Sequence, residues 1–319
     1  PFRFSLPVSR GILWLVPVLV LLLSVAGLRG GNRSDYLKID GTLMATGQNT
    51  YGQLGDGTTT HRSSPVQVVD SLGNPINGVL GSSTGFDHTV YLKSDGTVWA
   101  VGMNSYGQLG DGTQTPRSNP EPVLDLSGNP LSGVVGVSAG ESHTVFLKSD
   151  GTVWATGYNA FGQLGDGTTT DRLYPVQVTY AGGFALTEIV GVSAFGNHTV
   201  FLKNDGTVWT VGKNYYGQLG DGTTTDRSNP VQVVDAVGAP LSSMVAVSAG
   251  LDHSVFLKSD GTVWAVGRND DGQLGDGTNT HRSNPVQVVD AVGTPLSSIV
   301  AVAGSNHSVF LKSDGSVWT

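Results

Sequence analysis

The heptapeptide GQLGDGT at Gly52–Thr58 decides how this sequence is interpreted, because it returns unchanged four more times. The further copies begin at Gly107, Gly162, Gly217 and Gly272, each 55 residues after the last. The spacing of the glycines comes close to that of a phosphate-binding loop, but such a loop needs Lys directly after its second Gly. Thr stands in that place here, and the Asp inside the loop would repel a phosphate. The heptapeptide therefore indicates a structural repeat rather than a nucleotide site.

The 55-residue unit predicts four short antiparallel strands. In residues 134–188 the segments VVGVSA, HTVFLK, TVWAT and PVQVTY are rich in β-branched and aromatic residues, and glycine-containing turns separate the first three. Asp150-Gly151 joins the second segment to the third, and we predict a type I′ hairpin there. Four antiparallel strands repeated at a fixed period are typical of a propeller blade. We therefore predict an all-β protein, a β-propeller of four-stranded antiparallel blades, with about five units in residues 35–319.

The heptapeptide lies in a long loop between the third and fourth strands, as in Tyr158–Tyr174. Loops of that length need internal structure or a function. The glycines permit tight bends, the Asp side chain can cap turn amides, and the single Leu can anchor the loop in the core. We predict a self-supporting loop in every unit, with the anchors Leu54, Leu109, Leu164, Leu219 and Leu274.

A tryptophan and a histidine also recur at fixed places. The tryptophans are predicted to fill the space between blades, with an aromatic ligand platform as the alternative; they are Trp99, Trp154, Trp209, Trp264 and Trp318. The histidines are predicted to be structural and to hydrogen-bond a loop; they are His88, His143, His198, His253 and His307. Arg33 takes the place of the histidine in the first unit and Asp35 interrupts its apolar strand, so we expect that blade to be irregular.

Neither a metal site nor a catalytic site is predicted. Equivalent histidines of different blades are a blade width apart, whereas a metal needs several ligands around one ion. Two carboxylates accompany DGTTTD at Asp166 with Asp171 and at Asp221 with Asp226, but no calcium-binding motif surrounds them. The chain has no Cys, and neither a nucleophile motif nor an acid–base pair is evident. We predict no cofactor and no enzymatic activity.

The charge and the beginning of the sequence bear on partners and location. The formal net charge of −8 argues against a nucleic-acid partner, which requires a basic face. Residues 1–26 combine Arg3 and Arg10 with the apolar run Ile12–Leu23 and the small residues around Ala26. This pattern predicts a cleaved signal peptide, with an uncleaved membrane anchor as the alternative, followed by a linker over residues 27–34. We therefore expect an extracellular or cell-envelope protein that meets the membrane only through this segment.

The repeat LKSDGTVWAVGxNxxGQLGDGTTTxRSxPVQV resembles that of the regulator of chromosome condensation family, in its bacterial form. The resemblance covers residues 35–319 and implies a β-propeller, usually of seven blades, so we interpret the chain as a fragment of a longer array. The activity that named the family, nucleotide exchange on a small GTPase, needs a dedicated insertion for which the even spacing leaves no room. A secreted bacterial relative inhibits β-lactamases through its loop face, which makes enzyme inhibition a plausible subtype of binding.

The units differ in the tetrapeptide before GQLG, which reads QNTY, MNSY, YNAF, KNYY and RNDD. A second variable spot precedes each recurrent His. Aromatic residues among polar ones on the loops of a rigid scaffold suit a protein-binding face. The predicted binding residues are Tyr51, Tyr106, Phe161, Lys213, Tyr215, Tyr216, Arg268, Asp270 and Asp271. We predict an exported, non-catalytic scaffold that binds another protein or macromolecule; exchange-factor activity and a propeller hydrolase or lyase are the alternatives.

Overall fold

The computed structural model describes residues 33–38 and 40–319, and within them every helix-or-strand element is a β-strand. The predicted signal peptide or anchor, residues 1–26, lies outside the described residues. Of the predicted linker, Arg33 and Ser34 fall within the first strand. No helix in the described part of the chain is long and apolar enough to cross a membrane.

The strands form six antiparallel sheets in chain order, which we number as blades 1 to 6. Blade 1 consists of β1 (Arg33–Leu37), β2 (Leu43–Gly47) and β3 (Arg62–Gln67). Blade 2 consists of β4 (Val79–Thr84), β5 (His88–Lys93), β6 (Val98–Gly102) and β7 (Arg117–Pro122). Blade 3 consists of β8 (Val134–Ala139), β9 (His143–Lys148), β10 (Val153–Gly157) and β11 (Arg172–Gln177). Blade 4 consists of β12 (Ile189–Phe195), β13 (His198–Lys203), β14 (Val208–Gly212) and β15 (Arg227–Gln232). Blade 5 consists of β16 (Met244–Ala249), β17 (His253–Lys258), β18 (Val263–Gly267) and β19 (Arg282–Gln287). Blade 6 consists of β20 (Ile299–Gly304), β21 (Ser308–Lys312) and β22 (Val317–Trp318).

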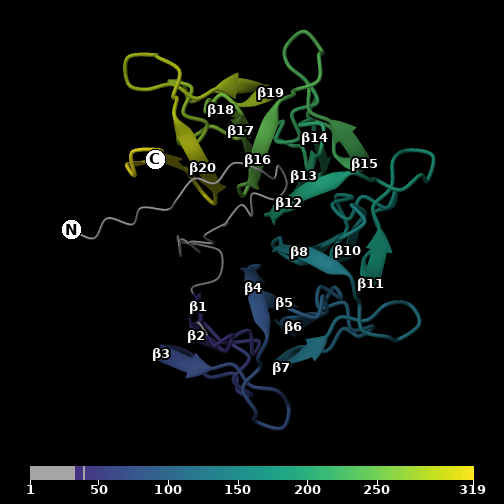
Figure 1. The fold of residues 1–319 in the computed structure, drawn as a ribbon. Coiled ribbons are helices and arrows are strands. Elements are labelled where there is room, and N and C mark those ends of the chain that lie inside the picture. The colour runs from purple at the N-terminus through teal and green to yellow at the C-terminus, as the bar shows by residue number, and fades with distance from the viewer. Residues whose placement is uncertain (1–32, 39) are drawn as a thin grey trace, which may run out of the picture.

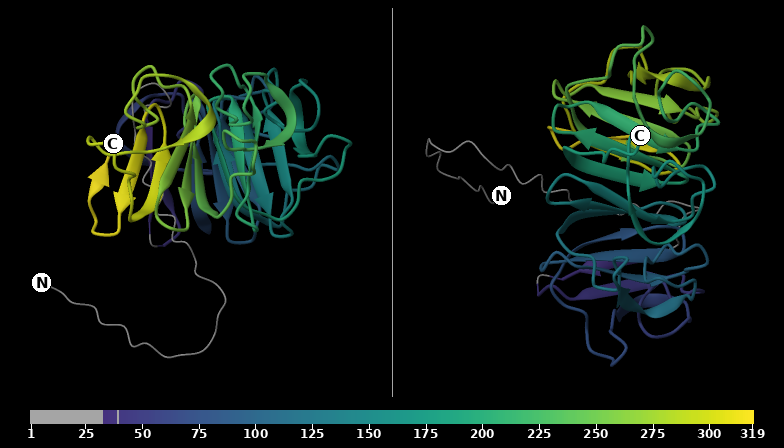
Figure 2. Two further views of the ribbon diagram at one scale, coloured as in Figure 1. Left: turned by 90° about the horizontal axis from the view of Figure 1, so that it is seen from above. Right: turned by 90° about the vertical axis from the view of Figure 1, so that its right-hand side faces the viewer.

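The sheets stand around a common centre, with the first strand of blades 2 to 6 innermost (Figure 1). Two further views show the strands running between two faces that carry the loops (Figure 2). Blades 2 to 5 have four strands each, whereas within the described residues blade 1 has no innermost strand and blade 6 no outermost one. The predicted all-β propeller of four-stranded antiparallel blades is confirmed.

The hydrophobic core lies between neighbouring blades. One buried cluster joins Val153 and Val178 of blade 3 to Ile189 and Phe201 of blade 4, and the half-buried Trp209 packs against it. Corresponding clusters take in the equivalent Trp side chain of the following blade at three other junctions. The prediction that the recurrent tryptophans fill the space between blades is therefore confirmed for Trp99, Trp154, Trp209 and Trp264.

Replacing Trp154 by Ala is expected to lower the free energy of unfolding by about 3 kcal/mol, the lower end for a large core aromatic, because the ring is only half-buried. Urea denaturation followed by circular dichroism measures this free energy, and Trp154→Phe should lower it clearly less than Trp154→Ala does. A near-neutral Trp154→Ala that abolished partner binding would instead make the ring a ligand platform.

The prediction of a type I′ hairpin is wrong. Positive φ angles of non-glycine residues in the described chain occur at Glu188, Ser243 and Ser298, so Asp150 does not adopt one. The loop has three residues and ends on Gly151 in the left-handed region, with the Gly151 N–H donated to the Lys148 carbonyl at 3.0 Å. The Asp150 carboxylate accepts the Thr152 N–H at 2.9 Å, so it satisfies the turn without a left-handed conformation of its own.

Four of the five recurrent histidines link consecutive blades, and the predicted loop partner is wrong for them; the fifth, His307, is exposed. His88 Nε2 lies 2.9 Å from Thr144 Oγ1 on the second strand of the next blade, and the same link joins His143, His198 and His253 to Thr or Ser hydroxyls. Because Thr144 Oγ1 donates its own proton to the Gln108 carbonyl at 2.7 Å, His88 Nε2 must be the donor. Burial lowers the pKa of His88, His143 and His198 to about 3 and that of His253 to about 4. These four side chains are therefore neutral in the fold at pH 7.

Blade 1 departs from this pattern as expected. Arg33 is buried where the other blades carry His, and its guanidinium donates to the His88 carbonyl oxygen. Burial also raises the pKa of Asp35 on the same strand.

Candidate functional site

Each long loop between the third and fourth strands of a blade, here called a strut loop, is organised by one buried asparagine. The Asn159 side-chain nitrogen donates to Asp166 Oδ1 at 3.2 Å and to the carbonyls of Thr168 and Thr170, and its oxygen accepts the Leu164 N–H at 3.0 Å. The buried Leu164 anchors the loop as predicted. The asparagine was missed, although its invariance inside the variable tetrapeptide was a signal; the five copies are Asn49, Asn104, Asn159, Asn214 and Asn269.

The aspartate of each heptapeptide pairs with an arginine. Arg172 lies 2.6 Å from Asp166, whose carboxylate also accepts the Thr168 N–H and hydroxyl proton. Burial alone would raise the pKa of Asp166, but these hydrogen bonds hold it below its usual value. The second carboxylate of DGTTTD, Asp171, accepts the Asn159 N–H at 2.8 Å. No three His, Asp or Glu side chains within residues 33–38 and 40–319 are grouped as a metal site requires.

The strut loops of blades 1 to 4 are each held by the next blade, and this fixes the position of their variable tetrapeptides. The Gly167 N–H donates to the Ser228 carbonyl of blade 4 at 2.9 Å. A Cβ added to Gly162 would lie 2.5 Å from Ser228 Cα, so this close approach requires glycine. The loops are therefore rigid supports for the side chains before GQLG.

Both variable spots of the sequence lie on the same face of the propeller, which we call the loop face. In blades 2 to 5 the residue that opens the tetrapeptide donates its N–H to the carbonyl oxygen of the residue before the recurrent His, as from Tyr158 to Ser142 at 2.9 Å and from Arg268 to Asp252 at 2.8 Å. Lys213 reaches across to the next blade and pairs with Asp252 at 2.9 Å. The face thus combines the strut loops with the loops between first and second strands.

Aromatic and cationic side chains from four consecutive blades contact one another on this face. The Tyr106 and Tyr158 rings are 4.8 Å apart, and Phe161 follows 6.1 Å from Tyr158. The Lys213 ammonium lies 5.9 Å from the Phe161 ring and 6.0 Å from that of Tyr216. Arg268 lies over Tyr216 from the following blade at 5.9 Å, and Tyr215 packs edge-on against Tyr216 at 4.8 Å. We call this array the aromatic ladder: Tyr106, Tyr158, Phe161, Lys213, Tyr215, Tyr216 and Arg268.

The structure brings eight of the nine predicted binding residues together. Besides the ladder members, Asp270 and Asp271 pair with Arg268 at 2.9 and 3.3 Å. Tyr51 on blade 1 is 37% exposed, and none of the ring contacts in the described chain joins it to the ladder. Tyr158 was missed as a site residue although it opens the tetrapeptide YNAF, and His281, 4.8 Å from the Tyr216 ring, was missed although His61 stands at the same place in its own unit.

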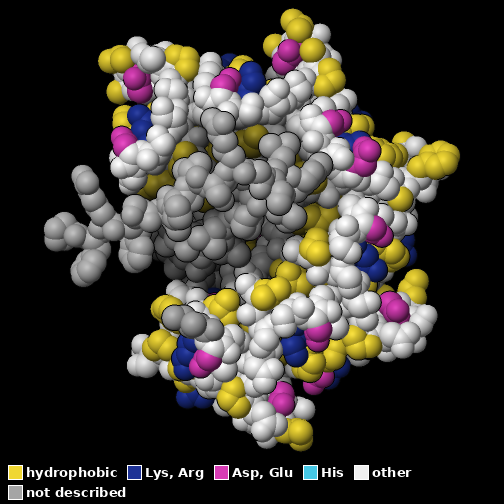
Figure 3. All heavy atoms as spheres, in the orientation of Figure 1, with side chains coloured by type: hydrophobic (Ala, Val, Ile, Leu, Met, Phe, Trp, Pro, Cys, Tyr) yellow, Lys and Arg dark blue, Asp and Glu magenta, His cyan; other side chains and the backbone are white. Residues whose placement is uncertain are grey.

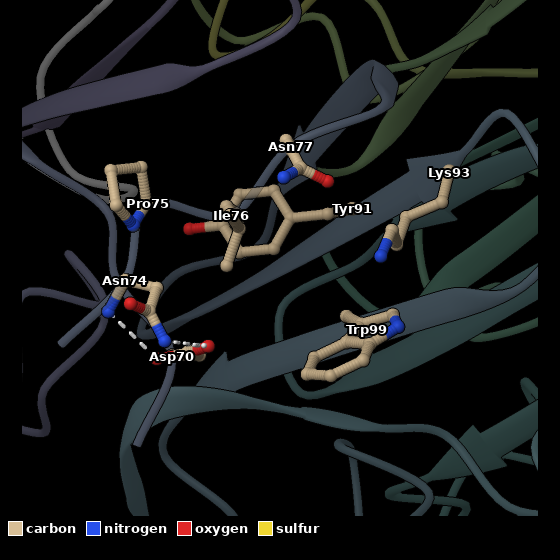
Figure 4. Close-up of a pocket in the computed structure, with 8 residues that line it drawn as sticks. All are labelled: Asp70, Asn74, Pro75, Ile76, Asn77, Tyr91, Lys93 and Trp99. Atoms are coloured by element: carbon tan, nitrogen blue, oxygen red, sulfur yellow. Dashed lines mark hydrogen bonds between the residues drawn. The ribbon is translucent and has the colours of Figure 1, made fainter. Parts of the chain in front are cut away.

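A pocket of about 340 Å³ opens in the ladder between the strut loops of blades 3 and 4. It is lined by Phe161, Lys213, Tyr215, Tyr216, Thr224 and Asp226. A second pocket, of about 290 Å³, lies between the loop that follows β3 and strands β5 and β6 (Figure 4). Its charged groups are already engaged, because Asp70 accepts hydrogen bonds from Asn74 and Lys93 lies over the Trp99 ring at 4.9 Å.

Apolar side chains are also exposed on the loops between blades, but singly. Leu72 and Val237 are 84% and 88% exposed there, and Figure 3 shows such side chains at the tips of loops that project outward. Isolated apolar residues of this kind are ordinary on protein surfaces, whereas the ladder is continuous. The ladder is therefore the better candidate site.

Comparison with family models matches the regulator of chromosome condensation repeat to residues 40–92, 95–147, 150–202, 205–257 and 260–311. The chain belongs to this repeat family. A second model of the same repeat matches residues 134–163, 189–218 and 244–273. Among curated relatives of the repeat family, the ultraviolet-B receptor UVR8 of Arabidopsis thaliana is 31% identical over 88% of this chain and 60% of its own length. The human E3 ubiquitin-protein ligase HERC2 is 29% identical over 96% of this chain but only 6% of its own.

Solved structures share the fold of this chain. The structure of Prp20p from Saccharomyces cerevisiae aligns with a TM-score of 0.61 at 17% identity, covering 88% of this chain and 79% of that one. The structure of human WBSCR16 aligns with a TM-score of 0.59 at 22% identity, covering 89% and 85%. The chain spans less than two thirds of the length of the curated relatives UVR8 and HERC2.

Proposed function

We propose that this propeller is a non-catalytic scaffold that binds another protein through the aromatic ladder of its loop face. The observation that carries the proposal is the ladder itself. Its aromatic and charged side chains come from the positions at which otherwise near-identical units differ, and rigid strut loops bring them into contact. Tyr and Arg anchors on a rigid support are the residues that dominate binding energy at protein interfaces.

Proteins of the same repeat family support a binding role. Prp20p of Saccharomyces cerevisiae is described as binding Gsp1p and histones, and a second structure shows Kap60 bound to yeast RCC1 (Prp20). UVR8 is named as a receptor. HERC2 is named as a ligase, but this chain matches 6% of it, so its ligase activity carries no weight here.

We also propose that the protein is exported, on the basis of the signal-like pattern in residues 1–26. Terminal sequencing of the protein from each cell fraction tests this. A mature chain that begins just after Ala26 and is recovered outside the cytoplasm is expected. An intact N-terminus in the cytoplasmic fraction would contradict export.

Replacing Tyr215 and Tyr216 together by Ala is expected to weaken partner binding at least tenfold, about 1.4 kcal/mol, with little effect on the fold. The tagged propeller captures its partner from extract, mass spectrometry identifies it, and calorimetry gives Kd for each variant. Lys148→Ala, on the hairpin at the opposite end of blade 3, is the control and should change Kd little. If Lys148→Ala removes the partner and the Tyr changes do not, the binding face has been misplaced.

A further inference from the structure

The carboxylates around the aromatic ladder outnumber its cations. Lys213 and Arg268 are its positively charged members, and their partners Asp252, Asp270 and Asp271 already neutralise them. Further carboxylates surround the ladder: Glu141, Asp171 and Asp226. Glu141 and Asp171 lie near the Tyr158 hydroxyl, whose pKa is raised by burial and by their charge together with that of Tyr106. The surface that presents the aromatic rings is therefore negatively charged.

The pocket in the ladder places one of these carboxylates beside an accessible ring. Asp226 is exposed, and its Oδ1 accepts the Asn214 N–H at 2.7 Å. Among the ion pairs of the described residues none includes Asp226. Tyr215 is 69% exposed, the most exposed ring of the ladder, and Tyr216 packs against it edge-on. A planar cation can stack on such a ring while it pairs with the carboxylate.

We propose that the partner presents a positively charged, arginine-bearing segment, whose guanidinium enters the pocket between Tyr215, Phe161 and Asp226. This deepens the binding role proposed above and rests on it. Lys213 does not oppose the incoming charge, because Asp252 neutralises it at 2.9 Å. Arginine suits the site better than lysine, since its planar, weakly hydrated group combines ring stacking with a hydrogen-bonded ion pair.

The test uses the fluorescein-labelled peptide GRGSGRGSGRG, with counterparts that carry Lys or Glu in place of each Arg. Fluorescence anisotropy with the full chain at low ionic strength is expected to show the highest affinity for the Arg peptide and a lower affinity for the Lys peptide. The Glu peptide should show no measurable binding. Tyr215→Ala with Tyr216→Ala should weaken the Arg peptide at least about tenfold. Asp226→Asn with Asp271→Asn should weaken it at least about fivefold, because the exchange removes two charges and keeps the acceptor oxygens.

The matched control is Asp95→Asn with Asp150→Asn, which makes the same change of charge on the hairpins of the opposite face and keeps the turn acceptors. It should leave the affinity for the Arg peptide unchanged. Equal affinity for the Arg and Glu peptides would overturn the proposal. So would an equal loss of affinity for the Arg peptide in the Asp226→Asn, Asp271→Asn variant and in the Asp95→Asn, Asp150→Asn control. If the Tyr changes release the natural partner while the Arg peptide binds no better than the Glu peptide, the binding face stands and this inference fails.

Discussion

Lowering the pH from 7 to about 5 is expected to remove most of the stability of this protein. His88, His143, His198 and His253 are buried and neutral, with pKa values of about 3 to 4, whereas a free histidine titrates near 6.5. The unfolded chain therefore takes up protons first as the pH falls below 6.5. Each histidine lowers the free energy of unfolding by up to about 1.4 kcal/mol per pH unit in that window. Over the roughly 1.5 pH units between 6.5 and 5, the four histidines together lower it by about 8 kcal/mol, which lies within the roughly 5–15 kcal/mol that stabilises a typical domain.

Urea denaturation at pH values from 7 to 4.5 measures this dependence. His143→Gln keeps an amide donor for Thr199 and cannot titrate. The slope of its free energy of unfolding against pH should therefore be smaller than that of the natural protein by about 1.4 kcal/mol per pH unit. His281→Gln is the control, because that side chain is partly exposed on the loop face. The strut-loop aspartates, whose pKa values are lowered, destabilise the fold only at lower pH, below about 4. A free energy of unfolding that stays constant between pH 7 and pH 5 would contradict the expectation.

Replacing Asn159 by Ala is expected to lower the free energy of unfolding by about 3–4 kcal/mol, more than an ordinary polar substitution. The change leaves the Leu164 N–H and the carbonyls of Thr168 and Thr170 without their partner, and it removes one donor from Asp166. The buried Leu164 N–H left unsatisfied costs about 1–3 kcal/mol, and the part-buried carbonyls cost less because water can reach them. Urea denaturation of the variant measures the loss.

An isosteric variant separates this hydrogen bonding from packing. Asn159→Asp keeps the acceptor for Leu164 but turns an oxygen toward Asp166 and the two carbonyls, so at pH 7 it should cost at least as much as Ala. Asn129→Ala, on an exposed turn, is the matched control and should stay within about 0.5 kcal/mol of wild type. If Asn159→Asp is as stable as the natural protein, the side-chain nitrogen does not organise the strut loop.

The repeated sequence determined the architecture by itself. A 55-residue period with four β-rich segments per unit leaves few alternatives to propeller blades, and a residue that recurs in every unit must serve the same need in every blade. The apolar positions were predictable for the same reason, since Leu164 and Trp209 sit at invariant places between glycine turns. The hairpin type could not be predicted, because Asp-Gly fits hairpin loops of two or of three residues. The choice between them depends on where the Asp carboxylate finds its hydrogen bonds.

Only the tertiary structure decided which residues of different blades meet. The partner of His88 lies 56 residues away on the next blade, and no local pattern distinguishes such a contact from one with a neighbouring loop. The contacts of the aromatic ladder could not be predicted for the same reason, because they join residues of different blades. Tyr106, Tyr158 and Tyr216 come from three separate units, and their spacing follows from the packing of blade against blade and from strut loops that rest on the following blade. The variable tetrapeptides marked where to look, but the distances between them, and hence a continuous site in place of separate loops, arose from that packing.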